Sequence, residues 1–116
     1  MSESYMVDDA DYVVVAYGAS ARVAKAAVRE AREQGIKAGL IRPITLWPFP
    51  KQAMRDAAEY AKAFLCVEMS MGQMIDDVKL AIDCSRPVEF FGRTGGIIPT
   101  PAEVLENIKK LAGGEK

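Results

Sequence analysis

A short, uninterrupted run of β-branched and aromatic residues constrains the fold of this chain more than any other feature. The run is Tyr12-Val13-Val14-Val15-Ala16-Tyr17, and it contains no charged residue. Strands that are buried on both faces have this composition, and they occur mostly in parallel sheets covered by helices. The run therefore predicts a central strand of an α/β domain.

Amphipathic helices are expected between this strand and three later ones. The first helix is expected from Ala21 to about Gln34, with Ser20 as its cap and Gly35 as its left-handed stop. The later strands are expected at Ile36–Ile41, Ala63–Glu68 and Pro87–Phe91. The later helices are expected at Lys51–Lys62, Ser70–Asp83 and Pro101–Ala112, the last two behind capping-box sequences. Strands that alternate with helices predict an α/β fold, a three-layer αβα sandwich around a mostly parallel sheet.

Small residues are expected to line the inner faces of the first two helices, which lets them lie close to the sheet. On the first helix the inner residues are Ala24, Ala27, Val28 and Ala31, and the outward residues are Lys25, Arg29, Arg32 and Glu33. On the second helix the inner residues are Ala53, Met54, Ala57, Ala58 and Ala61.

Length and charge indicate one ordinary domain. The 116 residues suffice for a single core, so we expect a domain over 11–112, a lead-in over 1–10 and a flexible tail over 113–116. The first residues lack the basic start and apolar stretch of a signal sequence, and no apolar run approaches the roughly 20 residues of a membrane helix. A net charge of −1 argues against nucleic acid or an anionic membrane as partner. A cytoplasmic location is expected.

The residues that most enzymes use for acid–base and metal chemistry are scarce. The chain has no histidine, which removes the commonest general base and any Ser-His or Cys-His pair. Its two cysteines cannot close a tetrahedral zinc site, and Cys66 in an apolar run is expected to be a buried thiol. A disulfide with Cys84 stays open. We expect no catalytic residue and no metal ligand set in this chain.

Functional groups in open α/β sheets lie beyond the carboxyl ends of the strands, and four segments qualify. A turn at Gly18 and Ser20 is a candidate anion site. The other three segments are candidate interdomain or subunit contacts, with the residues Arg42, Trp47, Phe49, Glu68, Met69, Met71, Arg93 and Thr94.

Each candidate has a structural alternative. The turn at Gly18 lacks the other glycines and the lysine of nucleotide-binding loops, so it is equally an ordinary strand-to-helix turn. Trp47 and Phe49 can fold back over the sheet edge, and methionines are common core fillers. Arg93 can pair with a carboxylate or phosphate, but the glycines beside it also simply permit a turn. Glu68 has no second carboxylate at a comparable strand end, which argues against a self-contained mechanism.

Several of these segments resemble a known family. Gly18 in its turn, Arg42–Pro48 and Val67-Glu68 resemble the C-terminal domain of transketolase-like, thiamine-diphosphate-dependent enzymes. Glu68–Met74 and Gly92–Pro101 resemble, more specifically, the alpha subunit of 2-oxoacid:ferredoxin oxidoreductases, in the branch that acts on 2-oxoglutarate or branched-chain 2-oxoacids.

The resemblance covers about residues 11–111 and implies both a fold and a role. The implied fold has a five-stranded mixed sheet, with the fifth strand expected at Tyr5–Asp8 or Ile97-Ile98. The implied parent complex oxidatively decarboxylates a 2-oxoacid to an acyl-coenzyme A and passes electrons through iron–sulfur clusters to ferredoxin. In that family other domains hold thiamine diphosphate, magnesium and the clusters, so no cofactor is expected here.

The chain is accordingly expected to be an excised, non-catalytic piece that contacts the other domains and subunits of such an oxidoreductase, inactive when isolated. A homodimer is a further candidate assembly. The alternative function is a small-ligand module that binds coenzyme A or a nucleotide through the turn at Gly18 and Ser20 together with Arg42 or Arg93.

Overall fold

Strand β2 (Tyr12–Ala16) is buried along its whole length, as its composition predicts. The structure, a computed structural model, describes residues 2–7, 9–16, 19–43, 51–59, 61–68, 88–92 and 100–113. The other elements in these ranges are β1 (Ser2–Tyr5), α1 (Ala19–Glu33), β3 (Ala38–Pro43), α2 (Lys51–Ala58), β4 (Ala63–Glu68), β5 (Val88–Gly92) and α4 (Pro101–Gly113). The helix predicted at 70–83 lies outside the described residues.

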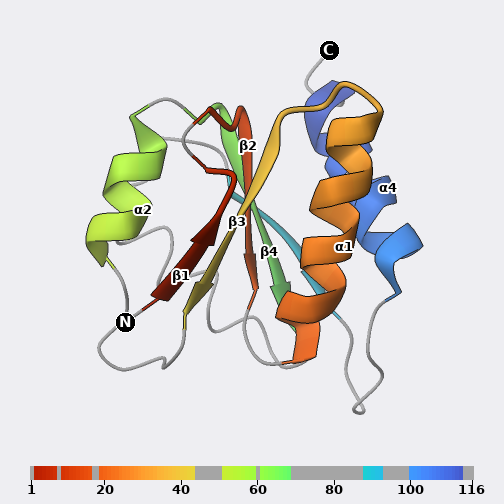
Figure 1. Ribbon diagram of the computed structural model, residues 1–116, viewed down its shortest axis with the longest axis horizontal. Coiled ribbons are helices and arrows are strands. Elements are labelled where there is room, and N and C mark those ends of the chain that lie inside the picture. Colours follow the sequence, from red (N-terminus) through yellow and green to blue (C-terminus); the bar gives the residue numbers. More distant parts are fainter. Residues whose placement is uncertain are drawn as a thin grey trace.

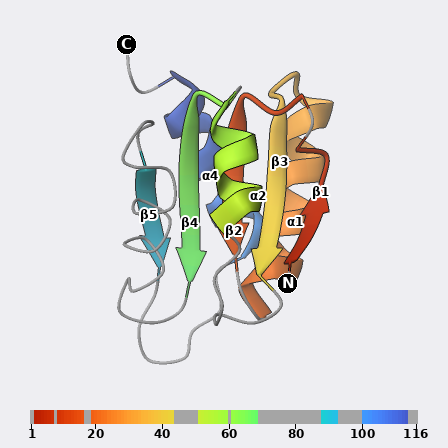
Figure 2. The ribbon, with the colours of Figure 1, turned by 90° about the vertical axis from the view of Figure 1, so that its left-hand side faces the viewer.

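The strands form one five-stranded sheet in the order β1-β3-β2-β4-β5, with β2 in the centre. Strand β2 pairs in parallel with β3 and with β4, and β5 pairs in parallel with β4. Only β1, at the edge, runs antiparallel to its neighbour β3, which Figure 2 shows as opposed arrowheads. The mostly parallel, mixed sheet predicted from the sequence is confirmed.

Helices cover both faces of the sheet (Figure 1). Alternate residues of β2 point to opposite faces: Val13 and Val15 pack with Met54 of α2, while Val14 and Ala16 pack with α1 and α4. The predicted inner residues are buried on both described helices: Ala24, Ala27, Val28 and Ala31 on α1, and Met54, Ala57 and Ala58 on α2. The side chain of Ala53 lies outside the description. The three-layer αβα sandwich is confirmed.

The end of α1 explains why β3 begins later than predicted. Gly35 has a φ of 88°, its N–H donates to the Arg32 carbonyl at 3.1 Å, and the Ile36 N–H donates to the Ala31 carbonyl at 2.9 Å. These two bonds form the Schellman motif expected for a glycine stop. Because Ile36 completes that motif, the strand predicted from Ile36 begins only at Ala38 and continues to Pro43.

Helix α2 ends earlier than predicted, and α4 begins as predicted. The Lys62 N–H donates to the Asp11 carbonyl, so the chain has already returned to the sheet where the sequence predicted helix as far as Lys62. At α4, Thr100 Oγ1 accepts from the Glu103 N–H at 3.2 Å, and Glu103 Oε1 accepts from the Thr100 N–H at 3.0 Å. This reciprocal pair confirms the capping box.

The fifth strand lies at the start of the chain, within the segment expected to be a lead-in. Of the predicted range Tyr5–Asp8, Tyr5 lies in the strand, whereas Met6 has a positive φ of 57° and turns the chain away from the sheet; Asp8 lies outside the described residues. The turn passes directly over Gly39, where an added Cβ would lie 2.7 Å from the Met6 carbonyl oxygen. The other predicted location, Ile97-Ile98, lies outside the described residues.

Candidate functional site

The carboxyl ends of β2, β3 and β4 meet at one edge of the sheet. Val15 of β2 is level with Ile41 on one side and with Cys66 on the other. Arg42 follows Ile41 near the end of β3, and Glu68 is the last residue of β4. The structure thus brings the backbones of these two predicted contact residues to the same edge, on opposite sides of β2.

Of the predicted contact residues, Arg42 has a described side chain. Arg42 is exposed, whereas Trp47, Phe49, Met69, Met71, Arg93 and Thr94 lie outside the described residues, as does the side chain of Glu68. These residues stay predictions as an interface.

Ser20 does not occupy the position that the sequence predicted. Helix α1 begins at Ala19, so Ser20 is its second residue and not its cap. The Ser20 side chain is fully buried, and within the described part of the chain its hydroxyl has no hydrogen-bond partner. Gly18, the other half of the predicted anion site, lies outside the described residues. The hydroxyl therefore gives no support to an anion site at this turn.

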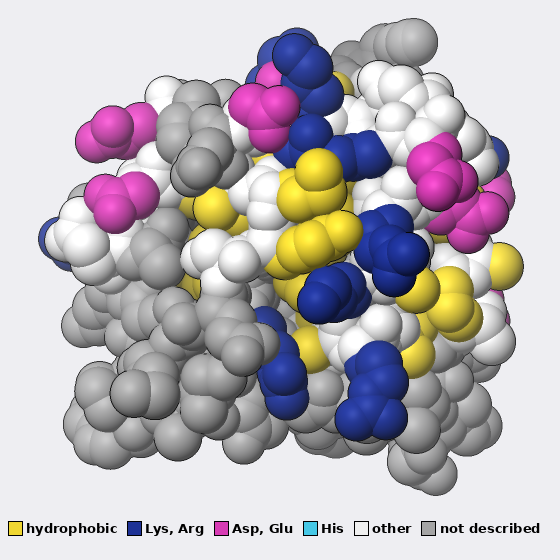
Figure 3. Space-filling model, viewed as in Figure 1, with side chains coloured by type: hydrophobic (Ala, Val, Ile, Leu, Met, Phe, Trp, Pro, Cys, Tyr) yellow, Lys and Arg dark blue, Asp and Glu magenta, His cyan; other side chains and the backbone are white. Residues whose placement is uncertain are grey.

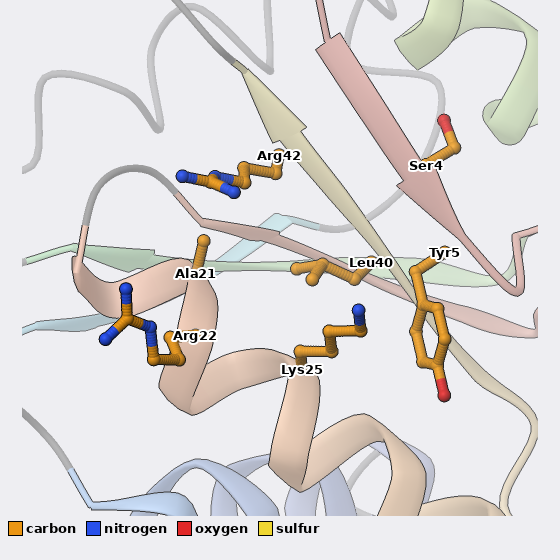
Figure 4. Close-up of a pocket in the computed structure, with 7 residues that line it drawn as sticks. All are labelled: Ser4, Tyr5, Ala21, Arg22, Lys25, Leu40 and Arg42. Carbon is orange, nitrogen blue, oxygen red and sulfur yellow. The ribbon is translucent and has the colours of Figure 1, made fainter.

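A pocket lies between strands β1 and β3 and the first turns of α1 (Figure 4). Its volume is about 530 Å³. The described residues that line it come from β1, β3 and α1: Ser4, Tyr5, Ala21, Arg22, Lys25, Leu40 and Arg42. Leu40 is almost fully buried and Ala21 is 2% exposed, so the pocket has an apolar floor beneath polar walls.

Three cationic side chains make this pocket basic. In Figure 4, Arg42 reaches from β3 toward Ala21, and Arg22 and Lys25 rise from α1 on the opposite wall. The Lys25 ammonium lies 4.9 Å from the centroid of the Tyr5 ring, a cation–π contact. No acidic side chain is among the described residues that line the pocket. Figure 3 shows Lys and Arg side chains gathered on the face that α1 occupies in Figure 1.

Reasoning from the sequence selected Arg42 but missed the rest of the pocket. Arg22 and Lys25 are three positions apart, which places them on the same face of a helix. This spacing is the feature of the sequence that could have indicated that both side chains belong to one site. Tyr5 carried no comparable signal, because its place in the wall depends on the antiparallel pairing of β1 with β3.

A second charged cluster ties the N-terminal segment to α1. The sequence predicted that Arg32 points outward, but its side chain is only 17% exposed. Arg32 Nη2 donates to Asp9 Oδ1 and to the Met6 carbonyl, each at 2.7 Å, and Nε donates to the Ala38 carbonyl at 2.7 Å. The hydrogen bond from Arg32 holds the pKa of Asp9 below its ordinary value of 3.8. This cluster anchors the turn that follows β1.

The described residues do not form a metal site. Among them, no group of three or more His, Cys, Asp or Glu side chains lies close enough together to hold an ion. The sequence contains two cysteines, fewer than the four thiolates of a common iron–sulfur cluster. Cys66 is buried within β4, as predicted. In the described part of the chain, no helix has the length and apolar character to cross a membrane.

The architecture is an α/β domain whose fold is also found in transketolase. It superposes on a chain described as "Split gene transketolase, inactive beta4 tetramer" with a TM-score of 0.80, covering 95% of this chain and 40% of that one at 19% identity. A 2-oxoglutarate:ferredoxin oxidoreductase from Magnetococcus marinus, solved with 2-oxoglutarate, coenzyme A and succinyl-CoA bound, superposes with a TM-score of 0.77 over 95% of this chain and 19% of that one, again at 19% identity. At this identity the two structures show the shared fold.

Residues 10–104 match the family model of pyruvate:ferredoxin oxidoreductase core domain II, and the chain belongs to that family. It is 52% identical over 111 residues to the ketoisovalerate oxidoreductase subunit VorB of Methanothermobacter marburgensis, covering 96% of this chain and 31% of the relative. It is 43% identical over 101 residues to the 2-oxoglutarate synthase subunit KorA of the same organism, covering 87% of this chain and 27% of that relative. The chain thus spans about a third of the length of these curated relatives. The predicted resemblance is confirmed.

Proposed function

We propose that this chain is a non-catalytic structural domain of a thiamine-diphosphate-dependent 2-oxoacid:ferredoxin oxidoreductase. The observation that carries the proposal is the match of residues 10–104 to core domain II, together with 52% identity to a ketoisovalerate oxidoreductase subunit. The role of the domain is to contact the other domains and subunits, which supply the catalytic groups. The alternative, a module whose main function is to bind coenzyme A or a nucleotide, has no support among the compared proteins.

The chemistry of the chain supports a non-catalytic role. Decarboxylation of a 2-oxoacid on thiamine diphosphate needs groups that move protons and ligands for the magnesium ion of the diphosphate. The sequence has no histidine, and the described residues contain no convergent set of acidic side chains. We therefore assign thiamine diphosphate, magnesium and the iron–sulfur clusters of the whole enzyme to other domains. Ferredoxin is the partner that accepts electrons from the whole enzyme.

The contact surface is assigned to the edge of the sheet where the strands end. Arg42 is exposed there, and the β4 backbone ends at Glu68 on the other side of β2. Arginine, methionine and aromatic residues are enriched in interfaces between proteins. We assign the same role to the residues of the adjoining segments: Trp47, Phe49, Met69, Met71, Arg93 and Thr94.

The substrate class is a branched-chain 2-oxoacid, with 2-oxoglutarate as the second candidate. The relative at 52% identity is a ketoisovalerate oxidoreductase subunit, and the relative at 43% is a 2-oxoglutarate synthase subunit. The implied product is the corresponding acyl-coenzyme A. A cytoplasmic location and a homodimer stay predictions.

Reconstitution tests the proposal. We expect the 116-residue chain alone neither to bind thiamine diphosphate with Mg²⁺ in calorimetric titration nor to reduce a viologen dye with 2-ketoisovalerate and coenzyme A. The complete enzyme that contains this chain is expected to do both. Comparing its kcat/KM for 2-ketoisovalerate with that for 2-oxoglutarate then decides the substrate branch.

The interface is tested by size-exclusion chromatography of the complex. Charge reversal at the strand ends, Arg42→Glu, is expected to weaken assembly, whereas the matched reversal Lys109→Glu on the exposed face of α4 is expected to leave assembly intact. Turnover by the isolated chain, or equal assembly of both variants, would contradict the proposal.

A further inference from the structure

Two of the positive charges of the basic pocket between β3 and α1 lie near the N-terminus of α1. Arg22 and Lys25 occupy the first two turns of α1, where the positive end of the helix dipole opposes cations. The first turn of the helix contains no acidic residue that would offset them, and Arg42 adds a third positive charge from the facing strand. Side chains at positions where they lower the stability of the fold are typical of functional sites.

The shape of the pocket favours a small ligand over a flat protein contact. Its volume of about 530 Å³ falls within the range of small-molecule sites, about 300–1,000 Å³. One guanidinium group can donate two parallel hydrogen bonds to the oxygens of a phosphate. Two guanidinium groups and one ammonium group therefore match the compact negative charge of a phosphate or diphosphate group. A protein segment would have to crowd several separate carboxylates into the same space.

The remaining walls fit the organic part of such a ligand. Leu40 forms an apolar floor, and Tyr5 presents an aromatic ring that already contacts the Lys25 ammonium (Figure 4). In the figure the two guanidiniums lie toward the Ala21 end of the pocket, and Tyr5 lies at the other end. This arrangement suits a phosphate at one end and a flat ring at the other.

We propose that this pocket binds a phosphate-bearing small molecule, with Arg22, Lys25 and Arg42 holding the phosphate and Tyr5 and Leu40 contacting the attached organic group. Ligand binding at this site is additional to the structural role of the domain. The site consists of other residues than the anion site predicted at Gly18 and Ser20. It does not require Arg42 to lack other interactions. A chain that failed to bind phosphate would still match core domain II, so the two proposals fail separately.

Titration followed by ¹H–¹⁵N NMR tests the proposal on the 116-residue chain in a phosphate-free buffer. The probes are inorganic pyrophosphate, adenosine 5′-diphosphate and a peptide of glutamates. We expect both phosphate probes to shift the amide signals of Tyr5, Arg22, Lys25, Leu40 and Arg42. Tighter binding of the nucleoside diphosphate indicates an organic phosphate ester as ligand, and equal binding indicates the inorganic anion. Either result supports a phosphate site.

Charge-neutralising variants provide the specificity control. We expect Arg22→Gln and Lys25→Gln each to weaken phosphate binding about tenfold, because a hydrogen bond to a charged group contributes about that factor. The matched variants Arg29→Gln on α1 and Lys109→Gln on α4 remove an exposed charge that does not line the pocket, and binding should stay within about twofold of wild type. The spectra themselves show whether each variant is folded.

Three results would overturn the proposal. The first is no shift at the pocket residues with either phosphate probe up to about 10 mM, the regime of very weak binding. The second is an equal loss of affinity in the Arg22 and Arg29 variants, which would mean diffuse electrostatic attraction. The third is tighter binding of the glutamate peptide than of either phosphate, which would make the pocket a contact for an acidic protein segment.

Discussion

The guanidinium of Arg32 reaches across 23 positions of the sequence to the carboxylate of Asp9, with Nη2 at 2.7 Å from Oδ1. The same side chain binds the carbonyls of Met6 and Ala38. One residue of α1 thus fastens the turn after β1 to the first residue of β3.

Replacement of Arg32 by methionine should destabilise the domain. The variant keeps much of the aliphatic packing of the mostly buried side chain but removes four hydrogen bonds, so we expect a loss of about 2 kcal/mol in the free energy of unfolding. Urea unfolding measures this loss. Arg29→Met, on the exposed face of the same helix, is the control and should change stability by less than about 0.5 kcal/mol. Equal effects of the two substitutions would show that the contacts of Arg32 contribute nothing.

The contact between Arg32 and Asp9 should make stability depend on pH in the acid range. The pKa of Asp9 in the folded chain lies below its ordinary value of 3.8, so the unfolded chain takes up a proton more readily. The stabilisation is therefore complete above the unfolded pKa and is lost as pH falls through the folded pKa. Between about pH 5 and pH 3, wild type should lose more stability than Asp9→Asn. Parallel curves of urea midpoint against pH for the two proteins would refute this expectation.

Gly39 should not tolerate a side chain. A Cβ at this position would lie 2.7 Å from the Met6 carbonyl oxygen and 2.9 Å from Val7 Cα, both backbone atoms. Gly39→Ala must displace the turn after β1, and we expect a loss of about 2–3 kcal/mol. Gly35→Ala is the matched control: apart from its own chain neighbours, no atom of the described residues lies within 4 Å of a Cβ at this position, so the positive φ of 88° is what opposes the substitution. That control should cost about 1 kcal/mol in thermal or urea unfolding. A larger loss at Gly35 would contradict the packing argument.

Ser20 and Thr100 should respond in opposite ways to alanine. The buried Ser20 hydroxyl has no partner in the described structure, so Ser20→Ala should be neutral or stabilising by up to about 1 kcal/mol. Thr100 caps α4, so Thr100→Ala should cost about 1 kcal/mol. Calorimetric melting of both variants checks the pair. A loss of stability in Ser20→Ala would restore a capping or binding role to that hydroxyl.

Local signals in the sequence predicted most of the fold. Strand β2 at Tyr12–Ala16, the glycine stop at Gly35 and the capping box at Thr100 each depend on neighbours within a few residues, and each lies where it was predicted. Strand β4 was predicted at its observed bounds, because Ala63–Glu68 is a short apolar run that ends in a charge. Residues whose environment is local can therefore be assigned from sequence alone.

Long-range contacts account for what the sequence did not predict. The role of Arg32 depends on residues 23 and 26 positions away, and the wall that Tyr5 contributes to the pocket depends on the pairing of β1 with β3. Helical periodicity places Arg32 on the face of α1 that points away from the sheet. It contains no information on the N-terminal turn, which packs over that face from another part of the chain. Ser20 was predicted to be a cap because the residue type suits that position, but the helix begins at Ala19, two residues earlier than predicted.

The strand order β1-β3-β2-β4-β5 also determines when the sheet can form during synthesis. Both neighbours of β2 lie downstream of it in the chain, and the second of them ends only at Glu68. The emerging polypeptide can pair β2 with β3 once Pro43 has been added, but the other edge of β2 stays unpaired until β4 has been made. Val13, Val14 and Val15 are in consequence the residues with the greatest need of protection by the ribosome surface or a chaperone before the domain closes.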